Sequence, residues 1–238
     1  MKIAIGTRFW GVNTEKDSPR ISSFIEAGKK IGDVFVAVNA AKDKIGTLEM
    51  FPEVAFPVTP WGKFVMPLNA LVLKAALAGA NHLLLASAEF APTEDQVDHL
   101  LQHMGGGSLV AGAKFAEHEF HPGEEVEGTG TTVPWNTFAL WNLETLSRIG
   151  FPLVGDSPLD PAQAGVEEVA TIATFQSIWH NQKAYLVRTP EIGGEWNTTG
   201  WSDDRLAKHM TKIESKKTRP AKQLGVANLA PPTVIHIG

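Results

Sequence analysis

Three short polar segments in the first half of the chain carry groups that can bind a charged or hydrogen-bonding ligand. The segments are Thr7-Arg8-Phe9, Asn39 and Ser87-Ala88-Glu89. They offer hydroxyl, guanidinium, amide and carboxylate groups, which bind phosphates, polar rings and metal ions in proteins. Each segment directly follows an apolar run, so whether the three can bind one ligand together depends on where those runs place them.

The apolar runs predict buried strands, and the stretches between them predict helices. The predicted strands of this half are 2–6, 33–38, 53–58, 82–86 and 109–115, and the predicted helices are 18–31, 67–80 and 92–104. Strands alternating with helices form a mostly parallel sheet, because each right-handed crossover returns the chain in the same direction. Ligands of such sheets bind beyond the carboxyl ends of the strands. We therefore expect the three polar segments to meet at one edge.

The second half has a less regular pattern. Its predicted elements are a Gly-, Glu- and Thr-rich loop at 117–132, a helix from Pro134 through Leu146, a helix from Gly165 to Trp179, a strand at 184–187, a helix over 203–222 and an irregular tail at 230–232. In the first of these helices Trp141 lies at helical spacing from Phe138, which favours a place in the core.

The order of these segments resembles the GT-A glycosyltransferases, a fold of the nucleotide-diphospho-sugar transferase superfamily, over roughly residues 2–180. The large family-2 group is the most similar. The positions that carry the resemblance are Thr7 and Phe9, Asn39, Asn69, Ser87-Ala88-Glu89, Trp135-Asn136 to Gly150-Phe151-Pro152, and Gly165-Val166-Glu167-Glu168. The implied fold class is α/β, with a mostly parallel central sheet and helices on both faces.

The resemblance also implies a function, which is transfer of a hexose from a nucleoside-diphosphate sugar to an acceptor hydroxyl, with inversion. The implied nucleotide-sugar-binding residues are Thr7, Arg8, Phe9, Asn39, Asn69 and Ser87. The implied acceptor-binding residues are Trp135 and Asn136. Glu168, or its neighbour Glu167, is the implied catalytic base. Adjacent residues at a helix start point about 100° apart, so we expect one of the two to face the pocket and the other to be exposed or to cap the helix.

One motif departs from the family pattern. Ser87 stands where the family has the first carboxylate of its Asp-x-Asp motif, which leaves Glu89 as the implied ligand of Mg²⁺ or Mn²⁺. A single glutamate can hold such an ion when substrate phosphates and waters complete the octahedron. The alternative is a metal-independent enzyme, in which Arg8, Lys63 or the basic C-terminal helix neutralises the diphosphate. A third interpretation of Glu89 is a cap on the helix that follows Pro92.

Composition limits the function classes. The 238 residues suit one domain, with a nucleotide-sugar-binding half at 2–115, an acceptor half at 116–204 and a basic C-terminal helix and tail at 205–238. The net charge of -5 argues against a nucleic-acid partner, and the absence of cysteine excludes disulfides and thiolate chemistry. No run is apolar enough to span a membrane, and we expect a cytoplasmic location. The oligomeric state stays open.

Two other functions fit the same residues. The altered Ser87-Ala88-Glu89 motif fits a catalytically silent nucleotide-sugar sensor or scaffold, which would bind without turnover. A sugar nucleotidyltransferase has a related fold, but its glycine-rich phosphate loop has no counterpart after the first strand, where the chain reads Gly6-Thr7-Arg8-Phe9. The sequence therefore favours the glycosyltransferase.

Overall fold

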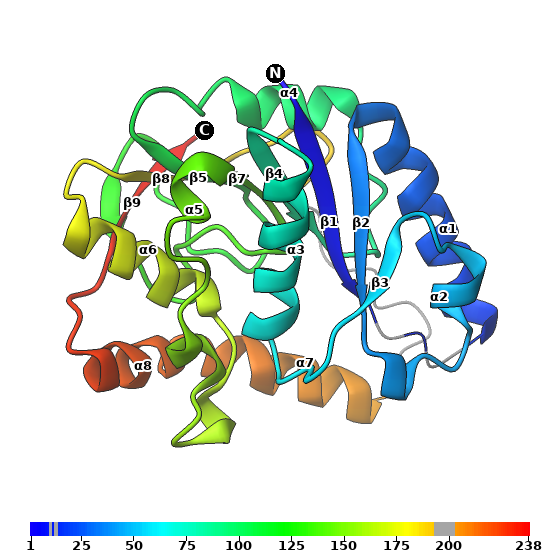
Figure 1. The fold of residues 1–238 in the computed structure, drawn as a ribbon. Coiled ribbons are helices and arrows are strands. Elements are labelled where there is room, and N and C mark those ends of the chain that lie inside the picture. Colours follow the sequence, from blue (N-terminus) through cyan, green and yellow to red (C-terminus); the bar gives the residue numbers. More distant parts are fainter. Residues whose placement is uncertain (10, 12–13, 193–202) are drawn as a thin grey trace.

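The computed structural model describes residues 1–9, 11, 14–192 and 203–238 (Figure 1). Within them a nine-stranded sheet has the order β3-β2-β1-β4-β7-β5-β8-β9-β6. The strands are β1 (Ile3–Phe9), β2 (Asp33–Val38), β3 (Ala55–Pro57), β4 (His82–Ala86), β5 (Ser108–Ala113), β6 (Glu125–Glu127), β7 (Phe138–Asn142), β8 (Lys183–Val187) and β9 (Thr233–Ile237). The helices are α1 (Thr14–Ile31), α2 (Thr47–Met50), α3 (Val65–Leu77), α4 (Glu94–Leu101), α5 (Leu143–Leu146), α6 (Glu167–Ile178), α7 (Asp203–Ser215) and α8 (Arg219–Ala227), with 3₁₀ turns η1 (Ala40–Lys42), η2 (Leu153–Asp156) and η3 (Pro161–Gln163).

The sheet is mostly parallel, as the alternating pattern predicts. β3, β2, β1 and β4 run in one direction, and β5, β8 and β9 are parallel to one another. β7 lies between β4 and β5 and is antiparallel to both, while β6 is antiparallel to β9. The mixed α/β architecture confirms the expected fold class.

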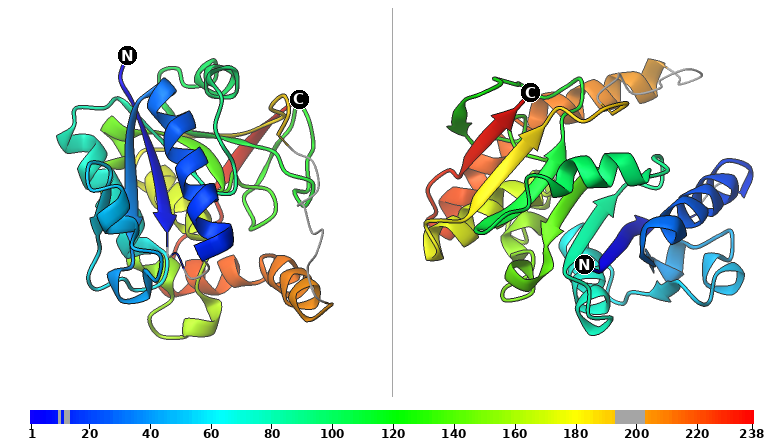
Figure 2. Two further views of the ribbon diagram at one scale, coloured as in Figure 1. Left: turned by 90° about the vertical axis from the view of Figure 1, so that its right-hand side faces the viewer. Right: turned by 90° about the horizontal axis from the view of Figure 1, so that it is seen from above.

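Helices cover both faces of the sheet. A Cβ atom added to Gly6 of β1 would lie 3.3 Å from Leu71 of α3. One added to Gly28 of α1 would meet Ile5, the residue before Gly6. Because successive strand residues point to opposite faces, α3 and α1 must pack on opposite sides. The left view of Figure 2 shows them on either side of β1 and β2.

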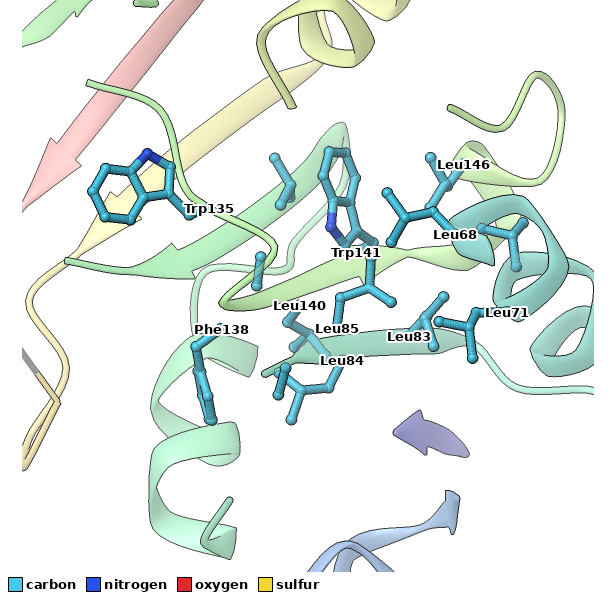
Figure 3. Close-up of a cluster of buried hydrophobic side chains, with 14 of the residues drawn as sticks. Leu68, Leu71, Leu83, Leu84, Leu85, Trp135, Phe138, Leu140, Trp141 and Leu146 are labelled. Carbon is cyan, nitrogen blue, oxygen red and sulfur yellow. The ribbon is translucent and has the colours of Figure 1, made fainter. Parts of the chain in front are cut away.

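The centre of the core lies where β4 meets β7. Leu83 pairs with Trp141 and Leu84 pairs with Leu140, so each pair lies on one face of the sheet. Figure 3 shows Leu84 and Phe138 on one side of the strand pair and Trp141 on the other. All five side chains are almost completely buried.

The helix predicted from Pro134 through Leu146 is wrong. Residues 138–142 form β7, and helix α5 begins only at Leu143. Phe138 through Trp141 are buried on both faces of the sheet, so every position is apolar and the alternation typical of strands is absent. A short run of this kind does not distinguish a strand from a buried helix. Trp141 is in the core as expected, but on a strand.

The C-terminal region also differs from the prediction. The single helix expected over 203–222 is two helices, α7 and α8, because Pro220 starts a new helix after the break at 216–218. The expected irregular tail continues into β9, which pairs with β8 and β6. Figure 1 and the left view of Figure 2 show α7 and α8 lying below the carboxyl end of β1. None of the described helices is long and apolar enough to cross a bilayer.

Candidate functional site

A pocket of about 380 Å³ opens where β1 and β4 end. Thr7-Arg8-Phe9 and Ser87-Ala88-Glu89 both line it, together with Asn136 and Thr137. β7 runs opposite to β4, so the residues before β7 lie at the edge where β4 ends, and the amide of Ser87 donates to the carbonyl of Thr137 at 2.9 Å. The first pocket thus contains a segment of the second half, Asn136-Thr137, beside the two first-half segments that the topology predicts there.

A second pocket of about 390 Å³ adjoins the first, since Phe64 lines both. Asn39, Lys42, Trp61 and Lys63 line this second pocket. Asn39 follows β2, the neighbour of β1 in the sheet. The three polar segments therefore meet along one edge, in two pockets that share a wall.

Thr7 lines the first pocket and carries an unsatisfied hydroxyl. The residue is 2% exposed, and its Oγ1 has no hydrogen-bond partner among the described residues. A buried hydroxyl without a partner costs on the order of 1–3 kcal/mol, so such atoms are rare and often mark a ligand site.

Arg8 joins the pocket to the start of α6. Its Nη1 donates to Oε1 of Glu167 at 3.0 Å and to the carbonyl of Phe64 at 3.3 Å. The guanidinium also lies over the Phe64 ring, 5.3 Å from its centroid. These contacts fix the charge of Arg8 beside both pockets.

Asn136 links the pocket to the two glutamates at the start of α6. Its backbone amide donates to Oε1 of Glu168 at 2.6 Å, and its Nδ2 lies 3.4 Å from Oε1 of Glu167. Trp141 Nε1 can only donate, and it lies 2.9 Å from Oδ1 of Asn136. The tryptophan therefore orients the amide so that its NH₂ group faces the carboxylate.

Both glutamates are buried, at 3% exposure for Glu167 and 5% for Glu168. The expectation that one of them would be exposed is therefore wrong. Arg8 compensates the charge of Glu167. Burial, followed by the negative charge of Glu167, raises the pKa of Glu168 to about 7. Neither carboxylate lines the first pocket, since Asn136 lies between.

Helix α8 holds the segment that leads into α6. Arg219 Nη1 donates to the carbonyl of Ala164 at 2.6 Å. Nε2 of Gln223 lies 2.8 Å from the carbonyl of Gly165 and 2.6 Å from that of Gln163. Val166 has a left-handed conformation, with φ 57°, and α6 begins directly after it. The C-terminal helix thus positions the two glutamates.

Arg20 is a pocket residue that the sequence patterns do not identify. It lies on α1 and lines the first pocket, where it donates to Asp17 at 2.8 Å and to Glu89 at 3.2 Å. Its guanidinium lies 5.7 Å from the centroid of the Phe9 ring, and its Nε is buried with no hydrogen-bond partner among the described residues. The one available signal was the spacing of Asp17 and Arg20, which places them on one face of a helix.

The residues at the pocket fit a dedicated metal site poorly. Glu89 is exposed, and Arg20 already binds its carboxylate. The described residues contain no group of three or more His, Asp or Glu side chains arranged to hold a metal ion. Glu89 does not cap α4 either, because Thr93 and Gln96 form a capping box there.

Besides the two glutamates, two other predicted residues, Asn69 and Trp135, do not line either of these pockets. Asn69 exchanges hydrogen bonds with the backbone of Phe151, at 2.7 and 3.0 Å, so it holds the loop after α5. Trp135 is 2% exposed and donates from Nε1 to Gly130 at 2.8 Å. Figure 3 shows its ring well away from that of Trp141. Ligand roles for Asn69 and Trp135 stay predictions.

Comparison with known proteins shows the fold. No protein-family model and no curated protein sequence matches the chain. The crystal structure of mannosyl-3-phosphoglycerate synthase from Rubrobacter xylanophilus is similar at a TM-score of 0.57 and 11% identity, over 95% of this chain and 75% of that one. The chain therefore has the GT-A-type fold that its segment order implies.

Two further crystal structures match at lower scores. S. aureus TarS 1-349 has a TM-score of 0.47 and 13% identity, over 83% of this chain and 58% of that one. Mannose-1-phosphate geranyltransferase from Thermus thermophilus has a TM-score of 0.48 and 13% identity, over 71% and 67%. The chain thus spans little more than half of the TarS fragment.

Proposed function

We propose that this protein transfers a sugar from a nucleoside-diphosphate sugar to an acceptor hydroxyl. The observation that carries the proposal is the meeting of Thr7, Asn39 and Ser87-Ala88-Glu89 in two adjoining pockets, with an unsatisfied hydroxyl at Thr7. Ligands of α/β sheets bind at this edge, and a buried hydroxyl without a partner suits a polar ligand.

The two pockets suit the two parts of a nucleotide. The second pocket offers the amide of Asn39 and the indole of Trp61, which can bind and stack on a nucleobase. Among the described residues that line one or other of the two pockets, four are cationic and Glu89 is the only carboxylate. The four are Arg8, Arg20, Lys42 and Lys63. Arg8 and Arg20 are ion-paired with Glu167, Asp17 and Glu89, but each guanidinium has five N–H donors, and in this proposal the remaining donors bind the diphosphate.

The transfer requires one proton acceptor. The acceptor hydroxyl attacks the anomeric carbon, the bond from that carbon to the phosphate oxygen breaks, and the electron pair leaves with the nucleoside diphosphate. We assign the acceptor proton to the carboxylate of Glu168, which lies behind Asn136 and not in the pocket wall, so one bridging water carries the proton to it. In a direct displacement Glu168 is then the base of an inverting reaction. A pKa of about 7 suits this role, because such a base is both ionised and proton-accepting near neutral pH.

Glu167 and Asn136 position the reacting groups in this proposal. Glu167 binds Arg8 and keeps its charge at the pocket, while Asn136 donates to Glu168 and orients it. The similar fold of a mannosyl-3-phosphoglycerate synthase supports sugar transfer as the reaction class. It leaves the sugar and the acceptor of this protein open.

Thermal unfolding with a panel of nucleoside diphosphates and nucleotide sugars tests the proposal. At least one nucleotide should raise the melting temperature of the wild type, because a ligand that binds only the folded state stabilises it. That nucleotide sugar should then be turned over, with release of the nucleoside diphosphate, when acceptors are added.

Three results distinguish the alternatives. Binding without turnover of any acceptor would favour a nucleotide-sugar sensor or scaffold. Release of pyrophosphate from a nucleoside triphosphate and a sugar phosphate would favour a nucleotidyltransferase. No stabilisation by any nucleotide would contradict the donor site itself.

A further inference from the structure

The guanidinium of Arg20 lies beside Glu89, where a metal ion bound by this carboxylate would lie. Arg20 binds Glu89 through Nη1 and Asp17 through Nη2. Asp17 is buried, at 7% exposure, so it anchors the guanidinium more firmly than the exposed Glu89 does. The ring of Phe9 packs against the guanidinium. Two carboxylates and one ring therefore fix the cation at the pocket wall.

The guanidinium keeps hydrogen-bonding capacity for a ligand. Arginine has five N–H donors in a planar fork, and the contacts to Asp17 and Glu89 engage two of its nitrogens through one bond each. Each of these two nitrogens carries a second N–H, and within the described residues the buried Nε and the buried Oγ1 of Thr7, which lines the same pocket, have no hydrogen-bond partner. Guanidinium and hydroxyl groups are suited to phosphate oxygens, which guanidinium binds in two-pronged fashion.

We infer that Arg20, together with Arg8, binds the diphosphate of the bound nucleotide through its remaining N–H donors, in place of a divalent cation. The inference rests on the proposed function and specifies its donor site. Glu89 then orients Arg20 and is no metal ligand. Binding of the nucleoside diphosphate, and stabilisation of it as leaving group, would need no Mg²⁺ or Mn²⁺.

Isothermal titration of UDP, GDP, ADP and CDP tests this in two buffers, one with EDTA and one with Mn²⁺. The tightest-binding diphosphate should bind the wild type in EDTA, and Mn²⁺ should change its Kd by less than about threefold. The nucleoside without phosphates, titrated alongside, reports the contribution of the base alone.

Substitutions at the two partners have opposite expected effects. Arg20→Gln should weaken diphosphate binding by about ten- to hundredfold and leave nucleoside binding unchanged, because one charged contact to phosphate is lost. Arg20→Lys should weaken binding less, since it keeps the charge. Glu89→Gln should bind the diphosphate in EDTA more tightly than the wild type, because a nearby negative charge is removed while the glutamine oxygen still accepts from Arg20.

Arg148→Gln is the matched control. Arg148 forms an exposed pair with Glu144 at 3.3 Å and lines neither pocket, so its loss should leave binding unchanged. Arg20→Gln removes an ionic partner of the buried Asp17 and can destabilise the fold. Glu89 is exposed, so Glu89→Gln keeps the test valid if Arg20→Gln does not fold.

Each outcome separates the role of Arg20 from the proposed function. Diphosphate binding that appears only with Mn²⁺ and disappears in Glu89→Gln would overturn the role of Arg20 and leave the proposed function intact. Equal binding of wild type and Arg20→Gln in EDTA would overturn it as well. Failure of all four diphosphates to bind in either buffer would contradict the proposed function itself.

Discussion

The protonation state of Glu168 controls the proposed reaction at the scale of single residues. Its pKa is raised to about 7 by burial and by Glu167, so the carboxyl group is largely protonated at pH 6 and ionised at pH 8. Only the ionised form accepts a proton. We expect the transfer rate at saturating substrate to rise with pH through about 7 and then to level off.

Glu168→Gln should lower the rate of transfer by about 10²- to 10⁴-fold, which is the usual contribution of a general base. Glutamine keeps an oxygen for the amide of Asn136, so the fold and the affinity for the nucleoside diphosphate should be retained. Rates measured across pH 5.5 to 8.5, with affinity by titration, check both statements. A variant that keeps the wild-type rate and pH profile would exclude Glu168 as the base.

Thr7→Val tests the unsatisfied hydroxyl. Valine has nearly the same shape, so folding stability should not fall, because the hydroxyl has no partner to lose. Binding of the nucleoside diphosphate should weaken by about tenfold. Thr7→Ser keeps the hydroxyl and should bind more tightly than Thr7→Val, while Thr233→Val, at an exposed position of β9, should have no effect. Unchanged binding in Thr7→Val would remove Thr7 from the donor site.

The sequence predicted some of the residues at the site but not others. Thr7, Asn39 and Glu89 follow apolar runs, so their meeting was predictable from topology. Arg20 lies inside a long helix among other charged residues, and only its tertiary contacts distinguish it. The burial of Glu167 depends on the same kind of contact, since Arg8 lies 159 positions earlier in the chain.

At the scale of elements, α8 holds the segment that leads into α6 by hydrogen bonds. Its Gln223 donates to backbone carbonyls of the segment that precedes Glu167 and Glu168. Gln223→Ala should lower the free energy of unfolding by about 1–3 kcal/mol, because buried carbonyl groups lose their donor. The transfer rate should fall too, since the start of α6 is no longer fixed.

Lys222→Ala on the same helix is the control for that substitution. Lys222 is exposed, so its removal should change the free energy of unfolding by no more than about 0.5 kcal/mol. Urea unfolding of both variants measures the difference. Equal stabilities of the two variants would show that α8 does not support α6 through Gln223.

Most elements of the first half were predictable because the apolar runs there are bounded by turn residues, whereas the four-residue helix α2 after β2 was not predicted. β7, by contrast, is buried on both faces, so its sequence does not alternate between apolar and polar residues. β9 is a strand because β8, some fifty residues earlier, offers it an unpaired edge. Its residues, Thr233 to Ile237, are mostly β-branched, a local strand signal that the expectation of an irregular tail did not use.

At the scale of the whole molecule, one continuous sheet joins the two halves. β7, from the second half, pairs with both β4 and β5 of the first, and β8 pairs with β5. The single-domain organisation remains a prediction. We expect one cooperative unfolding transition, with coincident curves from tryptophan fluorescence and far-ultraviolet circular dichroism in urea. Two separated transitions would show that the halves fold independently.

A crystal structure with the tightest-binding nucleoside diphosphate tests the central claim most directly. We predict phosphate oxygens within hydrogen-bond distance of Thr7 and Arg20, with the base in the adjoining pocket beside Asn39. A nucleotide bound elsewhere, for example at the opposite edge of the sheet near His82, would contradict the proposed donor site.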